Sequence, residues 1–401
     1  MEFVSFVPDY WNGPRHNRHY FCLELAKWHK VLFVSPPLSI EKYLTWSKRK
    51  AVPAAGTRHV GGNLWTHVSP GWLFTNYRFP WLDRQFRGLR SWLLKRAMRK
   101  LGFEDPVLLI WHPAFLEMLD AFRGRPSIYY IYDHLSGYGG SDPKQRWPRE
   151  LELLRRCDMV FALSRKLLEE NRPYNSNIFL LPNAVDFDHF SRARDESTEV
   201  PADLAAIPGP RIGYVGSINE KVDLGLLETM ARQRPGWSIV LIGRQNFATS
   251  AESTRFDELI AQPNVHWIPY RNPETLPAYL KGLDVCLMCY VINGWTYFGD
   301  PSKMHEYLAA GKPTIGAPLP AILEFADVIE VPRSQSEWLE AVARSLQPGN
   351  SAAIERRVQV ARQNSYSERI RAALTIIGEK FPGTASEDSA LRKDSNDRLE
   401  T

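Results

Sequence analysis

Short runs of apolar, β-branched and aromatic residues alternate with helical stretches along the first 190 residues of the chain. Strand-like and helical patterns that alternate in this way predict an α/β, doubly wound lobe. The predicted strands of this lobe are FVSFVP, HKVLFVSPP, VLLIWHP, SIYYIYDH, DMVFALS and IFLLPN.

The same pattern begins again after a charged, proline-bearing stretch. The strands predicted in the second series are RIGYVGS, WSIVLIG, NVHWIP, DVCLMCY, KPTIGAP and VIEVP. Two such series joined by one linker imply two Rossmann-like lobes whose parallel sheets face each other across a cleft. We therefore expect lobes at 1–190 and 210–348, a linker at 191–209, closing helices at 349–381, and a polar, disordered tail at 382–401.

Composition supports a globular protein in the cytoplasm. Of the 401 residues, 44% are hydrophobic and 24% are charged. The start, MEFVSFVP, lacks the basic region and long apolar core of a signal peptide, and no apolar run reaches the roughly 18 residues of a membrane span. The four cysteines include the pair Cys286 and Cys289 on an apolar strand, which we expect to be buried, reduced thiols.

The basic excess belongs to the first half of the chain. Residues 1–190 carry 27 Lys and Arg against 18 Asp and Glu, a balance of +9, whereas the whole chain has a formal charge of +5. The densest part is residues 84–101, RQFRGLRSWLLKRAMRKL, with seven basic residues and no acid. A helix there would be amphipathic.

Two interpretations of residues 84–101 stay open. The apolar positions recur at helical spacing, and the helix could simply pack Trp92 into its own lobe. It could instead lie on an anionic membrane surface, where a substrate would be anchored. Nucleic acid is not expected as a partner, because no recognised nucleic-acid module accompanies the helix. The apolar positions are Phe86, Leu89, Trp92, Leu93 and Ala97.

The run DPSKMHEYLAAGKP predicts a helix with Asp300 as its N-cap and Pro301 in its first turn. It follows a strand, so its start, with Ser302, lies at the carboxyl edge of the sheet, where free amides favour phosphate. Lys303 could then contact a diphosphate, and Glu306, one turn further, could accept hydrogen bonds from ribose hydroxyls. The alternative is a surface ion pair between Lys303 and Glu306.

These segments together resemble the GT-B glycosyltransferases of the retaining family 4 and, within it, the bacterial TuaH-like group. The resemblance is carried in order by NRHYFCLELAKWHKVLFVSPP, LPNAVDFDHF, RIGYVGSI and PSKMHEYLAAGKPTIGAPLP. It implies a C-terminal lobe that holds a nucleotide diphosphate sugar, usually a UDP-sugar, and an N-terminal lobe that holds the acceptor. It further implies a hexosyltransferase-type enzyme that transfers with retention onto a carbohydrate or lipid-linked hydroxyl, in polysaccharide or glycolipid assembly.

One position departs from the pattern of family 4. The family has Glu-x7-Glu in this segment; the second glutamate matches Glu306, and the first falls on Phe298. Asp300 or Asp284 could take the place of the missing carboxylate. The role of the first glutamate is therefore open here.

Further donor-binding candidates come from other turns of the C-terminal lobe. Gly216 and Ser217 follow a strand and would let the backbone approach a ligand closely, and Lys221 matches the family's lysine. A plain βα turn with a solvated lysine is the alternative. Arg244 and Tyr270 lie at later sheet edges and could line the base pocket, or lie on the surface.

In the N-terminal lobe, Gly13 resembles the glycine of the family's first loop, whose backbone lies near donor phosphate and acceptor. Arg15, Asn17 and Arg18 crowd the start of the next helix and would suit phosphate or a sugar carboxylate. Polar residues at a helix start can also be purely structural.

The strand SIYYIYDH ends at Asp133 and His134, close to the pocket histidine of family 4. Either residue could orient the sugar or assist removal of the acceptor proton, and Lys303 could stabilise the leaving diphosphate. His112, also at a strand end, is a further candidate.

Asp186 and Asp188 spell the D-x-D of metal-dependent GT-A enzymes, but their place at the end of the first lobe predicts an interlobe turn instead. We expect no metal and no cofactor besides the donor. Three alternatives remain: a GT-B nucleotide-sugar epimerase, a non-catalytic nucleotide-sugar or glycan-binding subunit, which Phe298 would favour, and a scaffold on a lipid surface.

Overall fold

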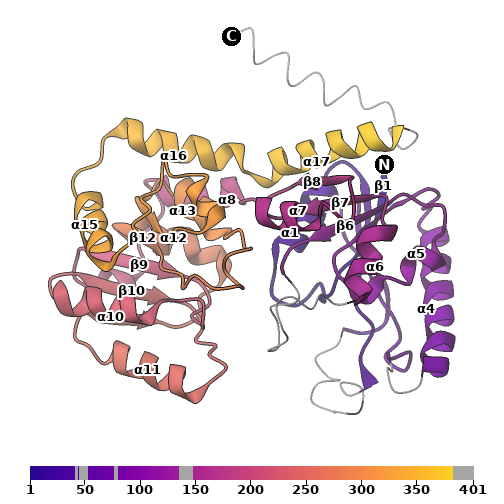
Figure 1. The fold of residues 1–401 in the computed structure, drawn as a ribbon, viewed down its shortest axis with the longest axis horizontal. Helices are drawn as coiled ribbons and strands as arrows, with labels where there is room; N and C mark the ends of the chain where they lie inside the picture. Colours follow the sequence, from indigo (N-terminus) through magenta and orange to yellow (C-terminus); the bar gives the residue numbers. More distant parts are fainter. Residues whose placement is uncertain (41–43, 45–52, 76–79, 135–147, 383–401) are drawn as a thin grey trace, which may run out of the picture.

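The computed structural model describes residues 1–40, 44, 53–75, 80–134 and 148–382, and it contains two α/β lobes below a pair of C-terminal helices (Figure 1). The expectation of two lobes, each built on a largely parallel sheet, is confirmed. The C-terminal tail predicted to be disordered lies outside the described residues, apart from its first position.

The N-terminal lobe is centred on a sheet that has eight strands among the described residues, in the order β3-β4-β2-β1-β5-β6-β7-β8. The central strands are buried along nearly their whole length, as parallel strands covered by helices on both faces must be. The strands are β1 (Glu2–Phe6), β2 (Lys30–Val34), β3 (Gly56–Gly61), β4 (Leu64–Val68), β5 (Val107–Ile110), β6 (Ser127–Ile131), β7 (Met159–Ala162) and β8 (Ile178–Leu180).

The C-terminal lobe has a parallel sheet with the order β11-β10-β9-β12-β13 among the described residues. In both lobes the strand order reverses direction beside the first strand, and ligands bind at such switch points, outside the carboxyl ends of the strands. The strands are β9 (Arg211–Val215), β10 (Ser238–Ile242), β11 (Val265–Ile268), β12 (Val285–Met288) and β13 (Thr314–Gly316).

Side-chain caps define where many of the helices begin. The oxygens of Ser164, Asp223, Thr249, Ser334 and Ser365 accept backbone N–H groups in the first turns of α7, α10, α11, α15 and α17. The helices of the first lobe are α1 (Asn17–Leu25), α4 (Pro80–Lys100), η1 (Pro113–Phe115), α5 (Met118–Ala121), α6 (Pro148–Arg156) and α7 (Arg165–Asn171). The others are α8 (Phe187–Ser191), η3 (Arg192–Arg194), α9 (Ala202–Ala205), α10 (Leu224–Gln233), α11 (Ser250–Ile260), η4 (Pro273–Thr275), α12 (Leu276–Lys281), α13 (Lys303–Ala309), α14 (Pro320–Leu323), α15 (Gln335–Ser345), α16 (Ser351–Gln363) and α17 (Tyr366–Lys380).

The last two helices join the lobes. Helix α16 lies over the C-terminal lobe, and α17 crosses back over the N-terminal lobe (Figure 1). Ile370, Leu374 and Ile377 of α17 belong to the hydrophobic core of the N-terminal lobe. The ring of Tyr366 stacks on that of Tyr20 of α1 at 5.4 Å. The end of the chain is therefore part of the first lobe's packing.

Two elements differ from the sequence prediction. The hairpin of β3 and β4 was not predicted, because nearly every residue of β3 is exposed and its sequence, GTRHVG, has no apolar alternation. VIEVP does not form a strand; it contributes a single bridge between Glu330 and Ile315. The thiols of Cys286 and Cys289 are free and buried, as expected.

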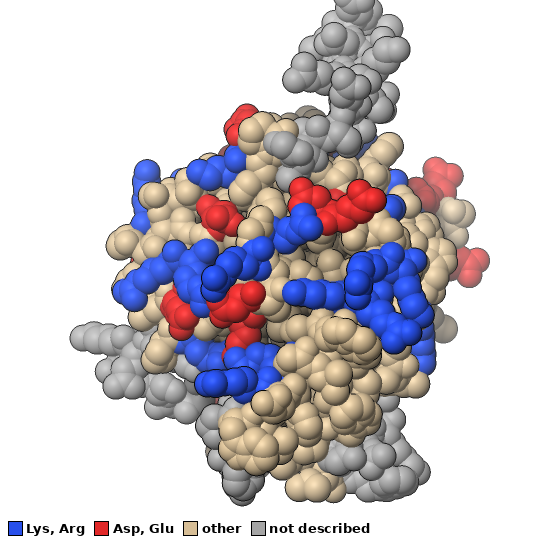
Figure 2. Space-filling view, turned by 90° about the vertical axis from the view of Figure 1, so that its right-hand side faces the viewer, with Lys and Arg blue, Asp and Glu red and all other residues tan. Residues whose placement is uncertain are grey.

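Helix α4 differs from the prediction that its Trp92 packs into the lobe. Trp92 is 49% exposed and Trp81 68% exposed, so Trp92 does not pack into the lobe. Both lie on the outer face together with Arg96 and Arg99, which are also exposed. Figure 2 shows Lys and Arg side chains spread over this face of the molecule, with a few acidic groups between them. No helix within the described residues is long and apolar enough to cross a membrane.

Candidate functional site

Two adjoining cavities lie where the lobes meet, at the carboxyl ends of both sheets. One, the Lys303 cavity, has a volume of about 300 Å³, and the other, the Glu306 cavity, about 360 Å³. Tyr132, Leu163, Asn183 and Ser302 line both, so the two cavities are direct neighbours. Sequence-predicted site residues from both lobes line these cavities, among them Asp133 and Arg18 of the first lobe and Lys221, Lys303 and Glu306 of the second.

Helix α13 delivers Lys303 to its cavity. The helix begins at Lys303 with Ser302 as N-cap, two residues later than predicted, and Asp300 is turned toward the other lobe instead of capping it. Gly216 has φ +139°, a backbone conformation that favours glycine, and a β-carbon there would overlap the end of the Lys303 side chain. Glycine at position 216 therefore suits the backbone of this turn and leaves room for the end of the Lys303 side chain beside it.

A second cation and a carboxylate face Lys303 across the cavity. Lys221 is half-buried with its Nζ 3.7 Å from the centre of the Trp295 ring. Burial lowers the pKa of Lys221, the charge of Asp133 opposes this, and Lys303 adds to it. Ser217 and Asp133 also line the cavity. Asp133, Lys221 and Lys303 are therefore close enough to influence one another.

Glu306 lies one turn further along α13, in the other cavity. Its Oε1 accepts a hydrogen bond of 3.4 Å from Ser302 Oγ. Burial raises the pKa of Glu306, against the opposing effects of Lys303 and Ser302. The alternative interpretation, a surface ion pair with Lys303, is not found among the ion pairs of the described residues, and Glu306 lines the cavity.

The first loop of the N-terminal lobe faces Glu306. Arg15, Asn17 and Arg18 line the same cavity. Arg18 forms an ion pair with Asp9 and lies 4.6 Å from the centre of the Tyr132 ring. These contacts hold its guanidinium at the wall of the cleft. Gly13 donates its N–H to Tyr10 O at 2.9 Å in a tight turn and does not line either cavity.

His134 and Phe298 form a contact between the lobes. Their rings stack at 4.3 Å with an interplanar angle of 13°. The Phe298 carbonyl accepts a 2.7 Å hydrogen bond from Ser164 Oγ, and His134 Nε2 lies 3.2 Å from Glu170 Oε2. His134 is buried and lines neither cavity, whereas its neighbour Asp133 does. The phenyl ring at position 298 thus packs against the first lobe.

Asp300 bridges the lobes through its hydrogen bonds. Its Oδ2 accepts the backbone N–H of Asn183 at 2.7 Å, and its carbonyl accepts the side-chain amide of the same residue. Burial raises the pKa of Asp300 to about 7, although the Asn183 N–H and the charge of Arg369 oppose the shift.

This raised pKa predicts a pH-dependent stability. Between about pH 4 and 7 the unfolded Asp300 is ionised while the folded one holds its proton, so its contribution is complete below pH 4 and is lost as pH rises through 7. Asp300→Asn keeps an acceptor for Asn183 and removes the titration. We expect the variant to gain stability relative to the native chain over this interval, by up to about 1.4 kcal/mol per pH unit. Urea unfolding at pH 4.5, 6 and 8 measures this, and parallel pH curves for both proteins would contradict it.

The remaining candidates lie outside the two cavities. Arg244 stacks on Tyr270 at 5.1 Å, and both are exposed at the carboxyl edge of the second sheet. His112 caps η1, its Nδ1 accepting the Ala114 N–H at 3.1 Å. The sequence analysis missed Tyr132 and Trp295 as lining residues. Tyr132 directly precedes Asp133 at a strand end, which could have indicated it, whereas Trp295 lies in an irregular loop.

The D-x-D segment forms the predicted interlobe turn. Asp186 caps α8 by accepting the His189 N–H, and Asp188 is exposed on that helix. Within the part of the chain that the structure describes, no three His, Cys, Asp or Glu side chains converge as metal ligands would.

Two Rossmann-like lobes, a cleft at their carboxyl edges and a terminal helix that returns to the first lobe define the GT-B glycosyltransferase fold. Residues 209–347 match the family model described as Glycosyl transferases group 1, so the second lobe is a glycosyltransferase group 1 domain.

The chain is also similar to a curated protein of Bacillus subtilis strain 168, described as a putative teichuronic acid biosynthesis glycosyltransferase, TuaH. The two are 30% identical over 179 residues, which is 43% of this chain and 43% of that protein. The matched region thus spans less than half the length of the curated relative.

Solved structures share the fold over nearly the whole chain. A sucrose-phosphate synthase from Thermosynechococcus elongatus has a TM-score of 0.67 and 16% identity, with 96% of this chain and 100% of that chain covered. The E. coli trehalose-6-phosphate structure bound with UDP-2-fluoro glucose has a TM-score of 0.67 and 11% identity, with 94% and 98% covered. HepE from Anabaena, in complex with UDP and glucose, has a TM-score of 0.64 and 13% identity, with 94% and 100% covered.

Proposed function

We propose that this protein transfers a hexose from a nucleotide diphosphate sugar, a UDP-sugar, to an acceptor hydroxyl in polysaccharide or glycolipid assembly. The observation that carries the proposal is the placement of Lys303 and Lys221 in one cavity and of Glu306 in the adjoining cavity, where the lobes of a glycosyltransferase fold meet. Two cations beside a buried carboxylate suit the diphosphate and the ribose of such a donor. The structures with bound UDP compounds support the choice of UDP.

The donor fits the cleft in one direction. Glu306 accepts the ribose hydroxyls, so the nucleoside occupies the Glu306 cavity, and the diphosphate passes Ser302 to reach Lys303. The sugar then lies in the Lys303 cavity, between Asp133 and Trp295. The flat apolar face of an indole suits the C–H face of a hexose.

Charge develops on the diphosphate as the sugar departs, and Lys303 and Lys221 stabilise it. Retention by double displacement needs a free carboxylate that attacks the anomeric carbon as a nucleophile. The described carboxylates that line the Lys303 cavity are Asp133 and Asp300, and Asp300 is held by Asn183 with a pKa raised to about 7. We therefore propose retention through departure and attack on one face of the sugar, with Asp133 near the acceptor proton.

We further propose that the reaction requires no metal, because two lysines stand where a divalent cation would otherwise neutralise the diphosphate. A phosphate group between two ammonium groups already has its charge compensated. The activity should accordingly persist in EDTA.

The exposed side of α4 supports a proposal that the enzyme acts while bound to the cytoplasmic surface of an anionic membrane. Trp81, Leu89 and Trp92 are exposed beside Arg84, Lys95, Arg96 and Arg99, so indole and aliphatic groups can enter the interface while the basic groups meet lipid phosphates. Arg87 and Arg90, which the sequence could not separate from these, are turned inward and pair with Asp83.

Reversing the outward charges tests this surface. Arg84, Arg96 and Arg99 changed together to Glu should weaken binding to phosphatidylglycerol vesicles at least about 100-fold, since each basic residue contributes about 1 kcal/mol. Cosedimentation measures the binding. The matched control reverses Arg172, Arg333 and Arg356, which are exposed elsewhere. Equal loss in both triple variants would reveal a net-charge effect and would exclude a specific surface.

The proposed function is tested with a panel of UDP-, GDP-, ADP- and dTDP-sugars. Thermal stabilisation by one donor together with slow release of its diphosphate is the expected result, with UDP-sugars the responders. Stabilisation without hydrolysis or transfer to any hydroxyl acceptor would favour the binding-subunit alternative. No response to any donor would contradict the proposal.

A further inference from the structure

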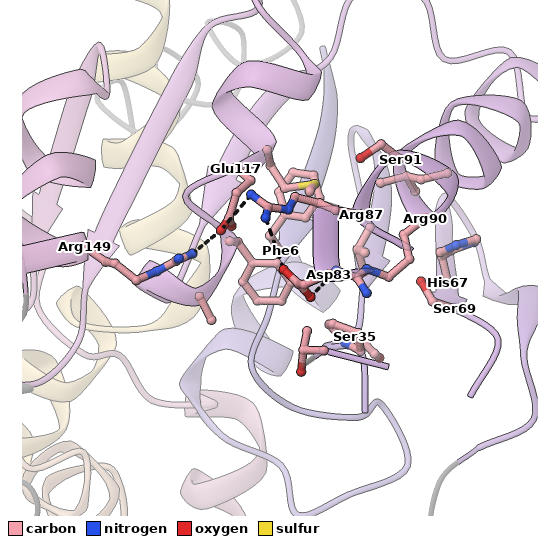
Figure 3. A pocket seen from close by; sticks show the side chains of 17 residues that line it. Phe6, Ser35, His67, Ser69, Asp83, Arg87, Arg90, Ser91, Glu117 and Arg149 are labelled. Carbon is pink, nitrogen blue, oxygen red and sulfur yellow. Dashed lines mark hydrogen bonds and ion pairs between the residues drawn. The ribbon is translucent and has the colours of Figure 1, made fainter. Parts of the chain in front are cut away.

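A third pocket opens in the N-terminal lobe, apart from the donor cavities (Figure 3). Its wall is formed by the ends of β1 and β2, the residues after β5, and the inner face of α4. This is the switch point of the first sheet, where open α/β lobes bind ligands. Its enclosed volume is about 50 Å³, enough for a hydroxymethyl group or a pair of hydroxyls and too small for a sugar ring.

The floor of this pocket holds polar atoms that have nothing to bind. Ser35 is 1% exposed and His67 5% exposed. Ser35 Oγ, His67 Nε2 and Arg87 Nε have no hydrogen-bond partner among the residues that the structure describes. An unsatisfied buried polar group costs about 1–3 kcal/mol, so these three atoms favour a polar group in the pocket, supplied by water or by a ligand that displaces it.

Three arginines and two carboxylates line the pocket, and each guanidinium group already has protein partners. Arg87 bridges Asp83 at 3.1 Å and Glu117 at 3.3 Å, and Arg149 lies 2.6 Å from Glu117 (Figure 3). Arg90 lies 3.6 Å from Asp83 and donates to the carbonyls of Leu73 and Phe74. A phosphate or carboxylate would therefore compete with Asp83 and Glu117 for guanidinium groups that are already paired. The burial of His67 lowers its pKa to about 4, so this ring adds no positive charge at neutral pH.

The unpaired groups instead match a neutral hydroxyl. Ser35 Oγ can donate and accept a hydrogen bond, and Arg87 Nε can donate one. His67 Nδ1 bonds Thr57 Oγ1 at 2.9 Å. His67 Nε2 accepts a hydrogen bond if Nδ1 carries the ring proton, and donates one if it does not. Phe6 and Phe115, whose rings are 5.6 Å apart, give the pocket an apolar side. A carbohydrate presents hydroxyl groups together with an apolar C–H face, so it can match both the polar groups and the aromatic side of the pocket.

The residues after β5 run from the donor cleft to this pocket. Trp111 lines the Glu306 cavity, Ala114 and Phe115 line the pocket, and His112 lies between them in the sequence. We propose that the pocket binds a non-reacting hydroxyl or hydroxymethyl group of a neutral sugar in the acceptor, whose reacting end lies past His112 in the cleft. That the bound sugar belongs to an acceptor rests on the proposed function. The preference of the pocket for carbohydrate can be tested separately.

Met118 lines the pocket and supplies a probe. In the full chain with ¹³C-methyl methionine, its resonance, assigned with Met118→Leu, is followed during titration with methyl glycosides of glucose, galactose and mannose. We expect a saturable shift with at least one of them and none with the matching hexuronides or inorganic phosphate. Ser35→Val, which fills the pocket and removes a buried unpaired hydroxyl, should weaken this binding at least tenfold without lowering the melting temperature. Ser336→Val, on the exposed surface of the second lobe, should bind like the native chain.

A Met118 shift with hexuronide or phosphate alone would overturn the inference in favour of an anion site, and silence with every probe would overturn it altogether. The native chain is tested with nucleotide-sugars in parallel. Donor binding with a silent Met118 would refute this pocket alone, whereas a saturable Met118 shift without any donor binding would refute the proposed transferase and leave a carbohydrate-binding pocket.

Discussion

Replacing Lys303 with alanine is expected to lower the turnover number about 100- to 1000-fold and to change donor affinity much less. Its ammonium group is fixed by the start of α13 and by the open space above Gly216, opposite the second lysine of the cavity. A preorganised cation acts most strongly where charge develops, so its removal costs more in the transition state than in the bound donor. Losses of this size are typical for one such group.

The measurement is release of the free diphosphate at saturating donor. Lys27→Ala, which removes an exposed lysine that pairs with Glu24 outside the cleft, is the matched control and should behave like the native chain. Lys303→Arg keeps the charge but must fit its wider head against Gly216, and should recover only part of the rate. A fall of less than threefold in Lys303→Ala would mean that the diphosphate lies elsewhere.

The sequence predicted the architecture because the buried parallel strands are nearly continuous apolar runs, and each series of them specifies one lobe. It missed β3, which is exposed at the edge of its sheet and is specified by pairing with β4 more than by its own pattern. A strand held by its neighbour has no signature in its own residues.

For the site, the position of a residue at a strand end or helix start could be predicted, but the direction of its side chain could not. Asp133 and His134 are adjacent, yet one lines the Lys303 cavity and the other stacks on Phe298. Arg87 and Arg84 belong to one basic run, and only the packing of α4 turns the first toward Asp83. Such choices depend on contacts with distant segments.

The structure shows what Phe298 contacts, which the sequence left open. The sequence places it where family 4 has the first glutamate, which left a dead binding subunit as an alternative. Its ring instead packs on His134 between the lobes, and its carbonyl is held by Ser164. This position therefore contributes to the contact between lobes, and the proposed contact with the nucleoside rests on Glu306 alone.

Glu306→Ala is accordingly expected to weaken UDP binding about 100-fold. A buried carboxylate that accepts two ribose hydroxyls contributes about 1.5–3 kcal/mol for each charge-assisted hydrogen bond, partly offset by the burial that raises its pKa. Glu306→Gln keeps the shape and one acceptor oxygen and should lose less. Both variants should fold, because the described contact that they lose is a single 3.4 Å bond from Ser302.

The decisive comparison is between UDP and 2′-deoxy-UDP, measured by calorimetry in the native chain and in Glu306→Ala. If Glu306 binds the 2′-hydroxyl, then removing the carboxylate and removing the hydroxyl disrupt the same bond. The native chain should then bind the deoxy nucleotide more weakly than UDP by about tenfold, and the variant should bind the two almost equally. A variant that still discriminates between them as strongly as the native chain would show that another group holds the ribose, and the direction of the donor in the cleft would have to be reversed.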